Sequence, residues 1–158
     1  MNNNYVLEMK TVQISPMRTL MTALKDILLE TNIVFSQELT DKNGKVSPAG
    51  IRIINMDKSH TILAHLFLDA FKFEHFYCKY PKIIIGVNMF HLFKLINSID
   101  NDDTLTIYIE EEDYCDGIVE HLGLKFENGD IKQSKIQKLK LIEPDEEELD
   151  MPSVKFSS

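Results

Sequence analysis

The sequence predicts an α+β domain made of two similar strand–helix–strands units. Two stretches, beginning near Ser15 and at Asn88, carry apolar residues at spacings of three and four, as helices with one buried side do. The segments around them alternate apolar and polar residues, as strands with one buried face do. The two helical stripes are 72 residues apart, and five positions stay apolar after that shift: Met17, Leu20, Met21, Leu24 and Ile27 against Met89, Leu92, Phe93, Ile96 and Ile99. This offset indicates an internal repeat.

The first unit is expected to open with a strand over residues 5–12. Ser15 can cap the helix that follows, with Pro16 at its first position. Further strands are expected over residues 32–39, 50–55 and 60–68, with a polar turn over residues 40–48.

The second unit has the same order. Asn88 can cap its helix through its side chain. Strands are expected over residues 73–79, 82–85, 104–110, 118–126 and 136–142, with a hairpin turn over residues 127–130. Two helices cannot cover both faces of so much sheet. We therefore expect packed antiparallel sheets with both helices side by side on one face.

Composition fits one globular domain, with 44% hydrophobic and 27% charged residues among 158. No apolar run approaches the roughly 18–20 residues of a membrane span. Cys78 and Cys115 have no metal-binding or redox spacing, so we expect free thiols in a reducing, intracellular compartment.

The formal net charge is −8, which argues against binding nucleic acid through bulk charge. The acids are concentrated, however. Three blocks within residues 100–103, 110–113 and 145–150 hold twelve of the 25 acidic residues. Elsewhere 17 basic residues outnumber 13 acidic ones, so a local basic surface is compatible with the sequence.

No catalytic or cofactor-binding motif is recognisable, and we expect no enzyme, no cofactor and no bound metal. Asp57, Ser59 and His60 are the residue types of a catalytic triad, but residues this close in sequence can rarely converge as nucleophile, base and orienting group. The acidic run at residues 110–113 is expected to be a solvated loop more often than a cation site.

The polar sides of the two helices are candidates for phosphate contacts. Arg18, Thr22 and Lys25 line up on the first helix, and the second offers His91 and Lys94. The ordinary alternative is a solvated polar face.

The segment after the last strand is acidic and contains two prolines, which indicates an extended surface connector or a disordered linker. Leu149 and Met151 are apolar residues within it that could pack on the domain or receive a partner.

These features resemble the first domain of a DNA sliding clamp of the proliferating cell nuclear antigen type. The most specific match is Asn55–His60, which is similar to the Met-Asp-x-Ser-His signature of the family. Residues 20–28 resemble the first pore-lining helix, and residues 86–94 resemble the entry to the second. Leu149, Met151 and Pro152 resemble the start of the loop that connects the two clamp domains.

The resemblance implies a non-enzymatic processivity factor whose ring encircles duplex DNA, with DNA polymerase, clamp loader and other peptide-bearing proteins as partners. It implies action in the nucleus, or at the site of viral DNA replication. The implied DNA-facing residues are Arg18, Lys25, Lys94 and, as a weaker candidate, Lys10. The implied peptide pocket comprises Met56, His60, Leu63, Leu149, Met151 and Pro152. Residues 118–126 resemble an edge strand that pairs with a neighbouring subunit in a ring trimer, through Leu122, Gly123, Leu124, Lys125 and Phe126.

Three features depart from the family pattern: Asn97 where lysine is common, an insert from Gln37 to Pro48, and the glutamate-rich connector. They indicate a divergent clamp and are compatible with a viral source. We expect a clamp domain at residues 1–142 and the start of the connecting loop at residues 143–158, with the second clamp domain absent from this chain. The alternative is an adaptor or decoy that binds clamp-interacting peptides without encircling DNA.

Overall fold

The computed structural model describes residues 4–56, 62–100, 102–128 and 133–143, and within them it leaves undescribed the side chains of residues 27, 54–56, 62–64 and 133. The elements are β1 (Tyr5–Thr11), α1 (Ile14–Ile27), β2 (Glu30–Ser36), β3 (Leu39–Thr40), β4 (Val46–Ser47), β5 (Gly50–Met56), β6 (Ile62–Asp69), η1 (Ala70–Lys72), β7 (His75–Cys78), β8 (Lys82–Asn88), α2 (Met89–Asn97), β9 (Thr104–Glu110), η2 (Glu111–Asp113), β10 (Tyr114–Cys115), β11 (Ile118–Val119), β12 (His121–Asn128) and β13 (Gln133–Lys140). Neither α-helix in these ranges is long and apolar enough to cross a membrane.

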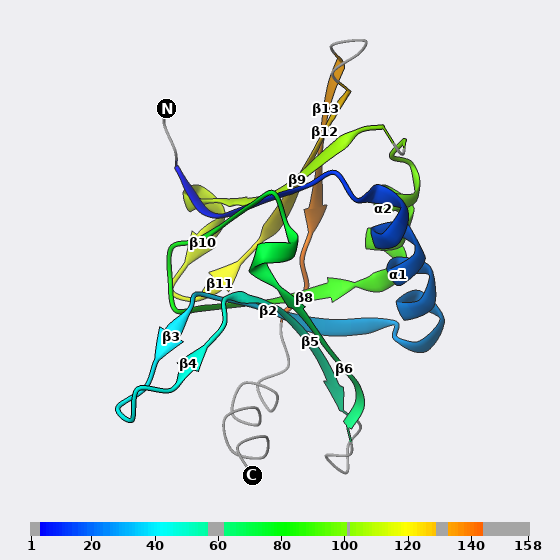
Figure 1. Ribbon diagram of the computed structural model, residues 1–158. Helices are drawn as coiled ribbons and strands as arrows, with labels where there is room; N and C mark the ends of the chain where they lie inside the picture. Colours follow the sequence, from blue (N-terminus) through cyan, green and yellow to red (C-terminus); the bar gives the residue numbers. More distant parts are fainter. Residues whose placement is uncertain (1–3, 57–61, 101, 129–132, 144–158) are drawn as a thin grey trace.

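Two antiparallel sheets form the body of the domain, as the sequence predicts (Figure 1). The larger has the order β13-β12-β9-β1-β7 and the smaller the order β6-β5-β2-β8. The two units exchange strands: β1 of the first unit pairs with β9 of the second, and β8 of the second pairs with β2 of the first. The strand orders β13-β12-β9-β1 in the larger sheet and β6-β5-β2-β8 in the smaller sheet are therefore equivalent, which confirms the internal repeat.

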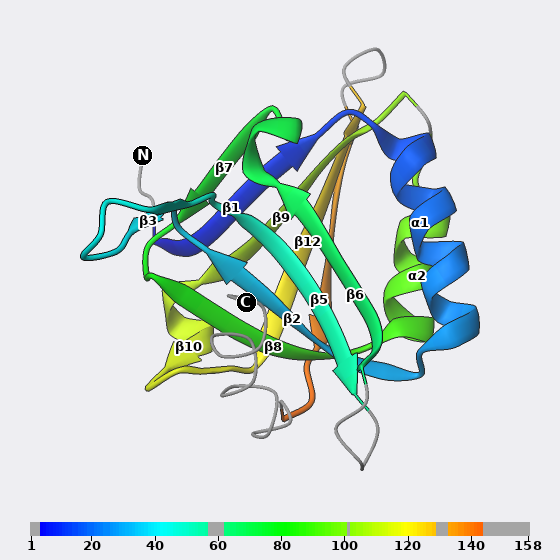
Figure 2. The ribbon, with the colours of Figure 1, turned by 60° about the horizontal axis from the view of Figure 1, so that its bottom comes forward.

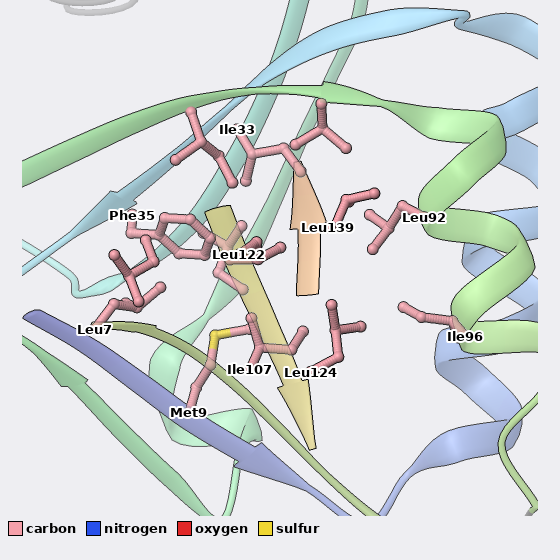
Figure 3. Packing of buried hydrophobic residues seen from close by; sticks show 14 of the residues in the cluster. Leu7, Met9, Ile33, Phe35, Leu92, Ile96, Ile107, Leu122, Leu124 and Leu139 are labelled. Carbon is pink, nitrogen blue, oxygen red and sulfur yellow. The ribbon is translucent and has the colours of Figure 1, made fainter. Parts of the chain in front are cut away.

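The hydrophobic core lies between the two sheets, and the helices close one open side of it (Figure 2). Leu7, Ile107 and Leu124 reach it from the larger sheet, and Ile33 and Phe35 from the smaller one (Figure 3). The apolar stripe of α2 adds Leu92 and Ile96 to the same cluster, so burial of that stripe holds the helix against the sheets.

The prediction that residues 118–126 form an edge strand is wrong. The segment divides at Glu120 into β11 and β12, and β12 lies between β9 and β13. Leu122, Leu124 and Phe126 are accordingly core residues, at most 6% exposed. Strand β13 pairs antiparallel with the outer side of β12, so β13 is the edge strand at this end of the larger sheet.

The two helices begin differently. The side chain of Asn88 accepts a hydrogen bond from the backbone N–H of His91 at 3.1 Å, which confirms it as the cap of α2. The predicted cap Ser15 lies inside α1, which begins at Ile14 after Gln13 without a side-chain cap. Pro16 then falls within the first helical turn, where a missing N–H costs no helical bond.

The insert also differs from its prediction. It forms a two-stranded hairpin, β3–β4, where the sequence predicts a turn without strands. Asp41 closes its tip by accepting hydrogen bonds from the backbone N–H groups of Asn43 and Lys45.

Both cysteines are free thiols. Cys78 is buried in the core, and burial raises the pKa of its thiol to about 11, whereas Cys115 is exposed. At neutral pH the Cys78 thiol therefore stays protonated and weakly reactive.

Candidate nucleic-acid interface

Helices α1 and α2 lie side by side and pack against each other (Figure 2). Three cations of the predicted DNA-facing set, Arg18, Lys25 and Lys94, come from these two helices. Asp26 is the single acidic residue within either helix, so the helix pair carries a local excess of positive charge in a chain with a net charge of −8.

Arg18 has a structural partner that the sequence pattern does not reveal. Its guanidinium donates a hydrogen bond to the backbone carbonyl of Ile99, just beyond the end of α2, and its side chain is only partly exposed. A backbone carbonyl beyond the end of a helix has no partner within the helix, and a charged guanidinium is a strong donor to it. Arg18 therefore ties α1 to the end of α2, which leaves fewer of its donors for a phosphate.

The two lysines lie along the aromatic side chains of α2. The Nζ atom of Lys25 is 4.9 Å from the centre of the Phe93 ring and 2.7 Å from an Asp26 carboxylate oxygen. Lys94 is exposed, with its Nζ atom 5.2 Å from the centre of the Phe90 ring. Such cation–π contacts hold the ammonium groups near the helix surface without neutralising their charge.

Lys10 belongs to a different surface. It lies in β1 opposite His75 and Thr106, in the larger sheet and not on the helix pair. Its strand neighbours Met9 and Thr11 are buried, so strand alternation turns Lys10 toward the outer face of that sheet. The structure therefore places Lys10, the weaker candidate, apart from Arg18, Lys25 and Lys94.

For the predicted peptide pocket, the structure describes only the backbone positions of Met56 and Leu63. Met56 ends β5 and Leu63 lies near the start of β6, so they belong to the same end of two paired strands. His60, Leu149, Met151 and Pro152 lie outside the described residues, as do Asp57 and Ser59 of the discounted triad.

The acidic run at residues 110–113 has a defined role that its sequence does not indicate. The Nζ atom of Lys138, in the edge strand β13, lies 2.6 Å from a Glu110 carboxylate oxygen and 3.1 Å from one of Asp113. These contacts raise the pKa of Lys138, so its ammonium stays charged. Asp113 also lies 3.1 Å from Nδ1 of His121. In the described part of the chain, no group of His, Cys, Asp or Glu residues is placed to hold a metal ion.

Comparison with known proteins identifies relatives for almost the whole chain. Residues 6–148 match the family model for the proliferating cell nuclear antigen, N-terminal domain. A probable DNA polymerase sliding clamp of Acanthamoeba polyphaga mimivirus is 27% identical over 182 residues, which cover 99% of this chain and 39% of that protein. The probable DNA polymerase sliding clamp 1 of Paramecium bursaria Chlorella virus 1 is 27% identical, covering 99% of this chain and 53% of its own length.

A cellular relative matches equally well. The proliferating cell nuclear antigen of Chaetomium thermophilum is 27% identical over 153 residues, which cover 97% of this chain and 52% of that protein. The chain thus spans about half the length, or less, of these curated relatives.

Replacing Arg18 by alanine is expected to lower the free energy of unfolding by about 1–3 kcal/mol, because a charge-assisted hydrogen bond is lost and the Ile99 carbonyl is left without it. Lys94→Ala, on the neighbouring helix, is the control and should change the value by less than about 0.5 kcal/mol, because the side chain is exposed. Urea denaturation followed by circular dichroism measures both. Equal losses would show that Arg18 does not hold the helix pair together.

Proposed function

Because the chain belongs to the family of the proliferating cell nuclear antigen N-terminal domain, we propose that it is the N-terminal domain of a DNA sliding clamp. The protein would act as a processivity factor that tethers DNA polymerase to duplex DNA and would catalyse no reaction itself. Its site of action would be the nucleus or, for a viral protein, the site of viral DNA replication. Residues 1–142 would form the clamp domain, and the acidic segment from residue 143 would begin the connection to a second domain.

The segregation of charge on the helix pair carries this proposal. Lys25 and Lys94 come from two helices that share one surface of the domain, beside a single acid. A surface of this kind attracts the phosphate backbone without reading bases, because phosphates carry no sequence information. Weak, sequence-independent contacts are what a protein that slides along DNA needs. Arg18 would contribute mainly by fixing the two helices relative to each other.

The free sheet edges support assembly into a ring. Strands β13 and β6 are equivalent in the repeat, and each lies at the edge of its sheet. An unpaired strand edge is a template for another strand. We infer that β13, in place of the predicted β12, pairs with a neighbouring subunit, and that β6 pairs with the second domain of the same protein.

The peptide pocket remains a proposal based on the family resemblance and the strand positions of Met56 and Leu63. A partner's short apolar peptide would bind beside these residues and His60, under Leu149, Met151 and Pro152. The polymerase and the clamp loader would then be recruited through the same pocket.

Reversing the helix charges should weaken DNA binding selectively. In Lys25→Glu/Lys94→Glu, we expect the slope of log K against log salt to fall by up to about 2, because each lost phosphate contact removes about 0.9. Lys10→Glu/Lys125→Glu makes the same charge change on strands β1 and β12 of the larger sheet and is the matched control. Binding of a polymerase-derived peptide should be unchanged in both but weakened in Leu63→Ala. Equal DNA binding by the two double variants, with peptide binding intact, would instead favour a peptide-binding adaptor.

The edge assignment can be tested with two isoleucines that are equally exposed. Ile136 in β13 and Ile118 in β11 are each 58% exposed, so aspartate at either position should leave the fold intact. Sedimentation of the clamp protein should show at least tenfold weaker self-association for Ile136→Asp and none of that loss for Ile118→Asp. Identical behaviour of the two variants would contradict pairing through β13.

A further inference from the structure

The inserted hairpin creates a groove on the outer face of the smaller sheet. We call it the hairpin groove. It has an open volume of about 140 Å³ and includes Val34 and Ser36 of β2, Leu39 of β3, Pro48, Arg52 of β5 and Lys82 of β8 in its lining. Val34 lies outside the hydrophobic core cluster, so this face of the sheet is the one turned away from the core.

The wall of the groove is held in a fixed position. The side-chain amide of Gln37 donates hydrogen bonds to the carbonyls of Cys78 and Lys79, each at 2.9 Å. The backbone N–H of Gln37 donates to the carbonyl of Pro81 at 3.1 Å. These bonds attach the base of the hairpin to the segment that leads into β8. The groove is therefore formed before any occupant binds, which lowers the entropy cost of binding.

The groove combines an apolar lining with two cations. Lys82 is exposed, and the guanidinium of Arg52 lies 5.2 Å from the centre of the Phe67 ring. Among the residues that the structure describes, no carboxylate forms an ion pair with either of them. The chemistry that matches this groove is a stretch of carboxylates, since carboxylates accept charge-assisted hydrogen bonds from Arg and Lys.

The chain after β13 is anchored to β8, the strand that contributes Lys82 to this groove. The N–H of Ile142 donates to the carbonyl of Gly86 at 3.0 Å, in an antiparallel bridge to β8. A Cβ atom at Gly86 would lie 2.6 Å from the Ile142 carbonyl oxygen, so the chain crosses directly over this glycine. Lys82 lies four residues before Gly86 in β8, and Glu146 follows Ile142 by the same number of residues. An extended chain that starts at the bridge is therefore long enough to reach the groove.

The sequence supplies matching charge at that point. Asp145, Glu146, Glu147 and Glu148 follow Pro144, which has no N–H to donate to β8. Pro144 cannot continue a backbone ladder with β8, so attachment of the acidic residues would depend on their side chains.

We propose that the acidic run Asp145–Glu148 docks in the hairpin groove, with its carboxylates on Lys82 and Arg52. The insert and the acidic connector, which depart separately from the family pattern, then form one intramolecular contact. This contact fixes where the connecting segment begins on the outer face of the smaller sheet. It does not depend on DNA binding or on the peptide pocket, so its test is independent of the proposed function.

Disulfide trapping tests the docking. The Lys82→Cys/Glu146→Cys pair is made in a Cys115→Ser background, where the remaining Cys78 is buried and unreactive. Under mild oxidation in dilute protein we expect an intramolecular disulfide, detected by mass and by mobility on a non-reducing gel. This disulfide should form at least ten times faster than the disulfide in the control variant Lys94→Cys/Glu146→Cys. In that control, one cysteine replaces an exposed lysine on α2. Added salt should reduce the difference, because it screens exposed ion pairs.

A second pair of variants examines the charge directly. Arg52→Glu in the same trapping background should slow the disulfide severalfold, and Arg52→Lys should preserve most of the rate. Equal trapping rates for residues 82 and 94 would overturn the proposal. So would predominantly intermolecular disulfides, which would assign the groove to a second copy of the chain.

Discussion

The two repeated units exchange strands, and this exchange joins them into one domain. Strand β1 completes the sheet of the second unit, and β8 completes the sheet of the first. Neither unit can bury its apolar side chains alone, because each sheet contains strands from both. Leu7 from β1 and Ile85 from β8 are each at most 1% exposed within the shared core. The exchange therefore makes one cooperative domain from two similar halves, and their two helices meet on one side (Figure 2).

The same exchange determines the surfaces available for function. In the larger sheet the exchanged strand β1 lies away from the edge strand β13, and in the smaller sheet β8 lies away from the edge strand β6. The two edge strands are therefore equivalent in the two units. The exchange also brings Lys25 of the first unit near Phe93 of the second, and the Arg18 guanidinium onto the Ile99 carbonyl. A domain with equivalent edges at both ends and a cationic helix pair across one side is suited to repetition around an axis. The basic surface would then face inward although the whole chain is acidic.

Much of this fold could be predicted from the sequence, because it depends on local patterns. The apolar stripes of both helices, the repeat, the Asn88 cap and the antiparallel strands follow from periodicity and capping chemistry. Strand order does not, since it depends on pairings between distant segments. Residues 118–126 resemble the edge strand of the family, yet β13 pairs with β12 on its outer side. The contacts that a side chain makes with a distant element cannot be predicted from the local sequence either. Nothing near Arg18 in the sequence indicates Ile99, 81 residues away, and nothing near Lys138 indicates Glu110.

If this domain contributes to a ring that encloses DNA, the assembled protein should be retained on DNA by topology. The full-length clamp would be loaded onto nicked circular DNA with its clamp loader, and the DNA would then be cut once at a distant site. We expect the protein to stay on the circle through a salt wash and to leave within minutes once the DNA is linear, because topology alone would hold it there. Retention that is equal on circular and linear DNA, or absent from both, would contradict this expectation.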